Sequence, residues 1–166
     1  MTRILGIDPG LGNTGWGVID YINNAPKHLA NGTIKTDPKT PLAKRLAKIA
    51  LELEQIITLW NPSEAAVEET FVNANPASAL KLGQARGVAL CAPARFGLET
   101  AEYAPNKIKK TIVGAGHAGK GQIQLMVGML MPRVEIHSAD SADALAIAIC
   151  HAHHRVSDTL KITEMV

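Results

Sequence analysis

Two carboxylates stand at the ends of apolar segments. Asp8 follows the apolar run 4–7 and Glu68 follows the run 65–67, so each is predicted to end a buried β-strand. Taken alone, Asp8 would also fit a turn, because a proline and a glycine come next. Glu68 has no comparable structural explanation. Its neighbour Glu69 should point to the opposite face of the strand and is left out of the candidate site.

Two further acids, Asp140 and Asp143, lie three residues apart in a segment with helical periodicity, which places both on one helix face. Taken alone, Asp140 would suit the N-cap of this helix. Asp143 is flanked by alanines and followed by a second apolar run, so its face is predicted to pack against the core. A lone carboxylate is costly to keep ionised there, and several would repel one another unless a cation joins them.

Together the four acids predict a metal centre built only from oxygen ligands. Such a set suits Mg²⁺, with Mn²⁺ as a substitute, better than zinc. Two ions about 4 Å apart can activate a water and stabilise the leaving oxygen in phosphodiester hydrolysis. The histidines compete poorly as ligands. His151, His153 and His154 are interpreted as surface imidazoles, and His117 lies in a glycine-rich loop without an assigned role.

The spacing of apolar residues changes along the chain, and it indicates which strands and helices must position these acids. Apolar runs bounded by turn residues predict five strands, at residues 4–7, 15–19, 28–36, 65–68 and 99–103. Apolar spacings of three and four predict five helices, at residues 41–60, 76–92, 106–113, 120–130 and 140–153. Ser138 is placed to cap the last of these helices. This order favours an α/β fold, with a mixed sheet flanked by helices.

Length and composition indicate one domain. The 166 residues are divided into a domain at 1–155 and a tail at 156–166, where apolar periodicity is lost and flexibility is expected. Cys91 and Cys150 lie in alanine-rich segments and are interpreted as buried. No signal-peptide pattern opens the sequence, and no apolar run approaches the roughly 18 residues of a membrane span. A cytoplasmic location is therefore expected.

The net charge of +2 is weakly basic and does not by itself indicate a nucleic-acid partner. The basic residues nevertheless gather in groups, which would be either solvated faces or phosphate contacts. These groups are Lys39, Lys44, Arg45 and Lys48; Lys81 and Arg86; and Lys107, Lys109, Lys110 and Lys120. The helix at 76–92 is rich in alanine and glycine, which permit close approach of another backbone, and it is the candidate face for self-association.

Several blocks of the sequence, in this order, resemble the RuvC family of bacterial Holliday junction resolvases. They are Gly6-Ile7-Asp8-Pro9-Gly10, Thr14-Gly15-Trp16-Gly17, Val67-Glu68-Glu69-Thr70-Phe71, Ser78-Ala79-Leu80-Lys81-Leu82-Gly83-Gln84-Ala85-Arg86-Gly87, Glu102-Tyr103-Ala104-Pro105 and Ala139-Asp140-Ser141-Ala142-Asp143-Ala144-Leu145-Ala146. The resemblance extends over nearly the whole chain and is most specific between Lys81 and Gly87.

The resemblance implies a ribonuclease H-like fold with a five-stranded mixed sheet. It also implies a homodimer that resolves Holliday junctions in recombination and DNA repair by symmetric, metal-dependent nicking, which leaves 5′-phosphate and 3′-hydroxyl ends. A branch-migration motor of RuvA and RuvB would be its partner.

The resemblance assigns catalysis and metal binding to the four acids, where the carboxylate chemistry described above favours two ions. It makes Lys109 and Lys120 cations at the scissile phosphate, and Phe71 an aromatic that stacks on bases at the junction centre. Without the family, Phe71 would be assigned to the core, and the two lysines would fit a solvated surface as well as a role in the site. Further DNA contacts are expected at Lys81, Arg86, Lys107 and Lys110.

Three other classes of protein explain the sequence less well. A YqgF-like RNA-processing nuclease would share the first strand and Asp8, but not the block from Lys81 to Gly87. An ATP-binding protein of the actin and sugar-kinase type needs two such domains, which 166 residues do not accommodate. A junction-binding module without catalysis would not need four acids, because spare carboxylates repel a phosphate backbone.

Overall fold

The computed structural model describes residues 1–69, 75–114 and 121–163, with side chains as far as Arg155. All ten predicted elements are present in it. The elements are β1 Thr2–Asp8, β2 Asn13–Ile22, β3 Ala25–Lys35, α1 Leu42–Trp60, β4 Glu64–Glu68, α2 Pro76–Arg95, β5 Glu99–Tyr103, α3 Pro105–Val113, α4 Gln122–Leu130 and α5 Ala139–Thr163.

The strands form one mixed sheet in the order β3-β2-β1-β4-β5. β1, β2 and β3 form an antiparallel meander, whereas β4 pairs in parallel with both β1 and β5. Asn23 and Asn24 both adopt positive φ angles in the tight turn between β2 and β3, a conformation that asparagine tolerates better than most residues. The predicted mixed five-stranded sheet is thereby confirmed, with β1 at its centre.

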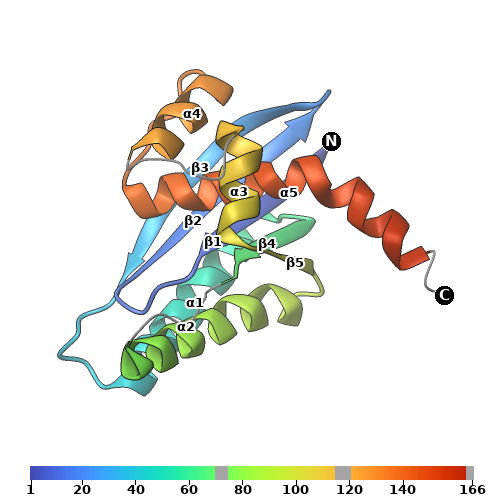
Figure 1. The fold of residues 1–166 in the computed structure, drawn as a ribbon. Helices are drawn as coiled ribbons and strands as arrows, with labels where there is room; N and C mark the ends of the chain where they lie inside the picture. The colour runs from blue at the N-terminus through green and yellow to red at the C-terminus, as the bar shows by residue number, and fades with distance from the viewer. Residues whose placement is uncertain (70–74, 115–120, 164–166) are drawn as a thin grey trace.

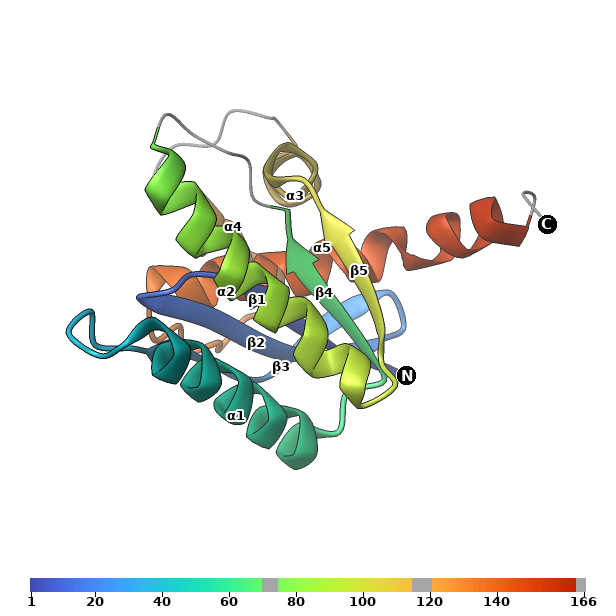
Figure 2. The same ribbon diagram turned by 90° about the horizontal axis from the view of Figure 1, so that it is seen from below.

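Alternation along β1 divides the core into two layers (Figures 1 and 2). Ile4 points to the face covered by α3, α4 and α5, where it joins the cluster that contains Leu145 of α5. Leu5 points to the other face, where it packs with Ile49 of α1 and with alanines of α2. Figure 2 shows α1 and α2 side by side on this second face.

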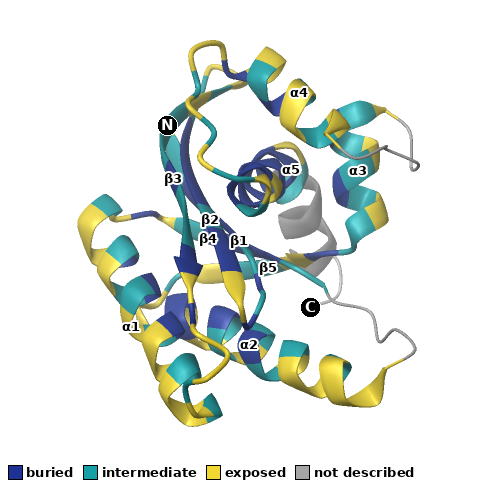
Figure 3. Cartoon of the chain, turned by 90° about the vertical axis from the view of Figure 1, so that its left-hand side faces the viewer, coloured by how far each residue is buried: buried dark blue, intermediate teal, exposed yellow. Residues whose placement is uncertain are grey.

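Helix α5 lies between the sheet and the pair α3 and α4, so it is buried on almost every side from Ala144 to Cys150 (Figure 3). It begins at Ala139, one residue before the predicted start, and continues to Thr163 rather than ending at His153. No glycine or proline lies between residues 154 and 163 to stop it, and a helix propagates readily once begun. No helix in the described part of the chain is long and apolar enough to cross a membrane.

The two cysteines differ in their surroundings. Cys150 is buried in α5, as predicted, but Cys91 is exposed on α2, so its predicted burial is wrong. The reason is that α2 buries only one of its faces against the core, although its sequence shows no apolar stripe that marks this face. Ala85 and Ala89 face the core and are buried, whereas Gly87 is exposed with the cysteine on the outer side.

Candidate active site

Strand alternation places Asp8 and Glu68 on the face of the sheet that α5 covers. Ile4 of β1 and Ala66 of β4 both belong to the cluster around α5. Asp8 and Glu68 follow them by four and two residues, and an even spacing in a strand keeps side chains on one face. The strands pair in parallel up to Ile7 and Val67, so the two acids are the next residue of each strand. The prediction that each of these acids ends a strand is confirmed, and the two strand ends lie side by side.

Helix α5 begins beside this edge, and Ser138 caps it. The Ser138 hydroxyl oxygen accepts a hydrogen bond from the Ser141 backbone N–H at 3.0 Å, and the Ser141 hydroxyl oxygen accepts one from the Ser138 N–H at 3.0 Å. The hydroxyls of Ser138 and Thr33 of β3 are 2.6 Å apart, which ties the helix start to the sheet. Ser138 is therefore the N-cap, and the alternative assignment of this role to Asp140 is wrong.

The four acids are close enough to affect one another's ionisation. Burial raises the pKa of Asp8 to about 8, and the charges of Glu68, Asp143 and Asp140 add to the effect. Burial also raises the pKa of Glu68 to about 7, with a contribution from the charge of Asp143. Strand ends and helix start thus form a cluster of mutually repelling carboxylates.

Asp143 is a solvent-exposed member of this cluster. Its side chain is exposed, whereas Ala142 and Ala144 on either side of it are buried. The prediction that Asp143 faces the core is therefore wrong, because adjacent residues on a helix point about 100° apart and only its neighbours face inward. Its pKa is still raised, because the surrounding protein displaces part of its water and Asp140 is close. An acid in this position combines access from solvent with contact to the cluster.

Lys109 supplies positive charge to the same site. It is on α3, which begins at Pro105 directly after β5. Its ammonium group acts to lower the pKa of Glu68 and that of Asp143, in opposition to burial. The structure thus brings Lys109 to the acids, as its predicted role requires, although the role itself stays a prediction. Lys120, Phe71 and His117 lie outside the described residues.

Comparison with known proteins places this geometry in a family. The sequence model of the crossover junction endodeoxyribonuclease RuvC family matches residues 4–151. The chain belongs to the RuvC family. It is 52% identical over 159 residues to the RuvC of Rhizobium etli, covering 96% of this chain and 94% of that protein. It is 57% identical over 155 residues to the RuvC of Rhodopseudomonas palustris, covering 93% and 89%.

A solved structure supports the same conclusion in three dimensions. The structure of Thermus thermophilus RuvC in complex with a Holliday junction substrate superposes with a TM-score of 0.88 at 32% identity. The match covers 96% of this chain and 98% of that one. The chain therefore has the ribonuclease H-like fold of RuvC, and it is a crossover junction endodeoxyribonuclease by family.

The oxygen-only ligand set expected of a RuvC nuclease fits a hard divalent cation. Burial and repulsion between carboxylates raise the pKa values of Asp8 and Glu68, and a bound cation would offset both effects by stabilising the ionised forms. Among the described residues, no three His, Cys, Asp or Glu side chains are arranged to hold an ion directly.

The other basic residues expected to contact DNA differ in how freely they could do so. Lys81 on α2 and Lys110 on α3 are exposed. The amine of Lys107 lies 4.7 Å from the centre of the Tyr103 ring, so it already makes a cation–π contact. The guanidinium of Arg86 is ion-paired with Glu102 of β5. A phosphate would have to compete with this pair for Arg86.

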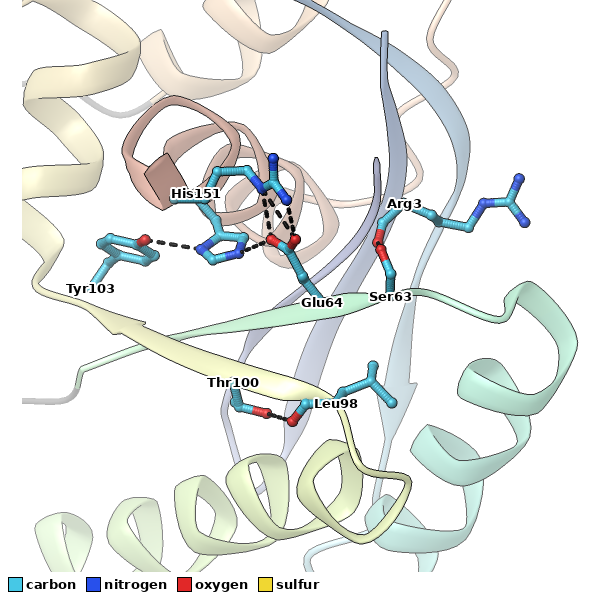
Figure 4. A network of polar contacts seen from close by, with 8 residues as sticks. Arg3, Ser63, Glu64, Leu98, Thr100, Tyr103 and His151 are labelled. Atoms are coloured by element: carbon cyan, nitrogen blue, oxygen red, sulfur yellow. Dashed lines mark hydrogen bonds and ion pairs between the residues drawn. The ribbon is translucent and has the colours of Figure 1, made fainter. Parts of the chain in front are cut away.

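A polar network that sequence reasoning missed joins α5 to strands β4 and β5 (Figure 4). His151 Nδ1 lies 2.9 Å from the Tyr103 hydroxyl, and Nε2 lies 2.8 Å from a carboxylate oxygen of Glu64. Arg155 Nε donates to the same carboxylate oxygen at 2.8 Å. His151 is 6% exposed, so its interpretation as a surface imidazole is wrong. Its partner Glu64 is 87 residues away, and no local pattern could indicate the pair.

Proposed function

We propose that this protein resolves four-way DNA junctions by metal-dependent hydrolysis of one phosphodiester bond in each of two symmetric strands. The products would be nicked duplexes with 5′-phosphate and 3′-hydroxyl ends, as needed for recombination and repair. The observation that carries the proposal is the meeting of Asp8, Glu68, Asp140 and Asp143 at one end of the sheet, with raised pKa values at three of them.

Asp8, Glu68, Asp140 and Asp143 would hold Mg²⁺, with Mn²⁺ as a substitute, and the number of carboxylates suits two ions. Bound metal would supply an activated water and stabilise charge on the leaving oxygen. The chain's own contribution is to keep these carboxylates together despite their repulsion. Lys109, with Lys120 as a second cation, would offset negative charge that develops on the scissile phosphate.

Recognition of the junction would depend on phosphate contacts, with sequence read mainly at the cleavage step. Lys81, Lys107 and Lys110, together with Arg86 when released from its ion pair, are the proposed contacts. Phe71 would stack on bases at the crossover. Because such contacts release counterions, affinity should fall steeply with salt.

The outer face of α2 is the proposed surface for a homodimer. Cβ atoms built on Gly83 and Gly87 meet nothing within 4 Å, so a second helix can approach this side closely. Leu80 on the same helix is 66% exposed, which leaves apolar area to be covered. A dimer fits a substrate with two equivalent strands to cut, because its two sites are related by the same symmetry. RuvA and RuvB are the proposed partners, in the bacterial cytoplasm where the chromosome lies.

The experiment is cleavage of a labelled four-way junction in Mg²⁺ or EDTA, with linear duplex as the control. We expect paired symmetric nicks on the junction alone, which ligase can seal and which EDTA abolishes. Asp143→Asn should abolish nicking and leave junction binding intact, because the lost charge serves the metal. Binding without nicks by the unaltered protein would indicate a binding module, and neither binding nor nicks would favour an RNA substrate.

A further inference from the structure

Three glycines on the face of the sheet beneath α5 allow this helix to lie close to the strands. They are Gly6 of β1 and Gly15 and Gly17 of β2, and Gly6 pairs with Gly17 across the ladder. A Cβ built on Gly6 would lie 2.0 Å from the Ala144 carbonyl oxygen. A Cβ on Gly17 would lie 2.7 Å from the end of the Leu145 side chain. Both contacts concern the buried middle of the helix.

Gly15 differs from the other two in the residue that it faces. A Cβ built there would lie 2.0 Å from the backbone carbonyl oxygen of Asp140 and 3.1 Å from its Cβ. On the other side, Gly15 is the ladder partner of Asp8 in β1. Gly15 therefore lies between two acids of the site that come from separate elements. The two are close enough for the charge of Asp140 to help raise the pKa of Asp8.

We infer that Gly15 is a positioning residue for the metal site, which sets the separation of Asp8 and Asp140 through the absence of a side chain. The inference rests on the proposed function of these acids. Real Cβ atoms essentially never approach another heavy atom within 3.0 Å, so a methyl group at Gly15 must displace the Asp140 backbone or β2 by about 1 Å. Catalytic groups must be held to within about 0.5 Å, and Mg²⁺ demands near-ideal octahedral geometry.

The atom that would be displaced cannot move aside alone. The clash is with a backbone oxygen, which moves only with the first turn of α5. That turn is anchored by the capping bonds of Ser138 and by its contact with Thr33. The strain is therefore expected to shift the segment that carries Asp140, and the effect on metal binding to exceed the effect on folding.

The test is Gly15→Ala with two matched glycine controls. A Cβ at Gly12 meets nothing within 4 Å, so Gly12→Ala repeats the chemical change in the turn before β2 without a clash. Gly17→Ala clashes chiefly with the flexible Leu145 side chain, so it disturbs the packing of α5 two residues away from the site. It controls for a general loss of stability.

Four quantities are measured for each variant of the full chain: the midpoint of thermal unfolding, junction binding in EDTA, Mn²⁺ binding by calorimetry without DNA, and the single-turnover cleavage rate against Mg²⁺ concentration. For Gly15→Ala we expect junction binding within about twofold of the unaltered protein and Mn²⁺ binding at least about tenfold weaker. We expect cleavage about 100-fold slower, the loss associated with a 1 Å misplacement, with partial recovery at high Mg²⁺. Gly12→Ala should match the unaltered protein, and Gly17→Ala should lose stability but keep its Mn²⁺ affinity.

A double-variant cycle with Asp140→Asn separates positioning from a structural effect. If Gly15 acts through Asp140, Gly15→Ala should weaken Mn²⁺ binding little further once Asp140 is changed. If Gly15→Ala folds poorly, the same measurements are made after adding Ala139→Gly, which loosens the backbone before Asp140. The inference would be overturned if Gly15→Ala, alone or with Ala139→Gly, folds and binds Mn²⁺ as tightly as the unaltered protein. It would also be overturned if Gly17→Ala loses as much Mn²⁺ affinity as Gly15→Ala. If the unaltered protein neither binds Mn²⁺ nor cuts junctions, the proposed function itself has failed.

Discussion

Asp8 and Glu68 end two parallel strands, and their carboxyl groups lie close enough for each to affect the ionisation of the other. Burial and neighbouring carboxylates raise the pKa of Asp8 to about 8, and burial raises the pKa of Glu68 to about 7, so the metal-free pair retains a proton near neutral pH. A divalent cation between the two acids would displace this proton, so metal binding should release protons.

Because the proton on Asp8 is bound more tightly in the folded protein, the stability of the metal-free protein should depend on pH. The pKa of Asp8 rises from 3.8 to about 8 on folding. Its contribution is then fully present below about pH 4 and is lost as the pH rises through 8. The free energy of unfolding in EDTA, measured by urea titration, should therefore decline over this range. Asp8→Asn cannot ionise and should decline less, and an identical decline in both proteins would contradict the assignment.

The two neighbouring acids at the end of β4, Glu68 and Glu69, should differ strongly in their importance for cleavage. Glu68 faces α5 and lies close to the other acids of the site, whereas Glu69 follows it in the chain and points away by strand alternation. We expect Glu68→Gln to lower the single-turnover cleavage rate by about 100-fold or more, since it removes a ligand charge. Glu69→Gln is the matched control and should change the rate by less than about threefold. Equal losses would mean that the register of β4 does not select the active acid.

Lys109 and Lys110 provide a similar comparison on α3. The charge of Lys109 acts on Glu68 and Asp143, whereas Lys110 is exposed and lines a hollow with Thr111 and His153. Lys109→Met should slow cleavage by about 10- to 100-fold with little change in junction affinity, because its charge is directed at the site of chemistry. Lys110→Met should instead weaken binding and lower the salt dependence of affinity, as loss of one phosphate contact does. Cleavage kinetics and binding at several salt concentrations distinguish the two.

The network around His151 should contribute to stability. Burial holds the pKa of His151 below its usual range, so the ring is neutral, donates from Nε2 to Glu64 and accepts the Tyr103 hydroxyl at Nδ1. Tyr103→Phe should cost about 1 kcal/mol of unfolding free energy, and His151→Ala about 1–3 kcal/mol, because it leaves buried polar partners unpaired. His153→Ala, an exposed change on the same helix, should cost less than about 0.5 kcal/mol. Chemical denaturation measures all three.

Much of the fold could be predicted from local pattern, because strands and helices have different apolar periods. The ends of α1 at Leu42 and Trp60 match the positions of Pro41 and Asn61, which are signals within a few residues of the chain. The C-terminal end of α5 was missed because nothing in residues 154–163 marks either an end or a continuation. Asp8 and Glu68 were found because an acid at the end of an apolar strand is locally anomalous.

The sequence by itself therefore determined the elements, the acids and, through resemblance, the family. Only the tertiary structure decided how these parts meet, because contacts between distant segments leave no periodic trace. The exposure of Asp143, the burial of His151 beside Glu64 and the pairing of Arg86 with Glu102 all depend on such contacts. The same holds for Gly15, whose position against Asp140 arises where β2 and α5, more than a hundred residues apart, are packed together by the core.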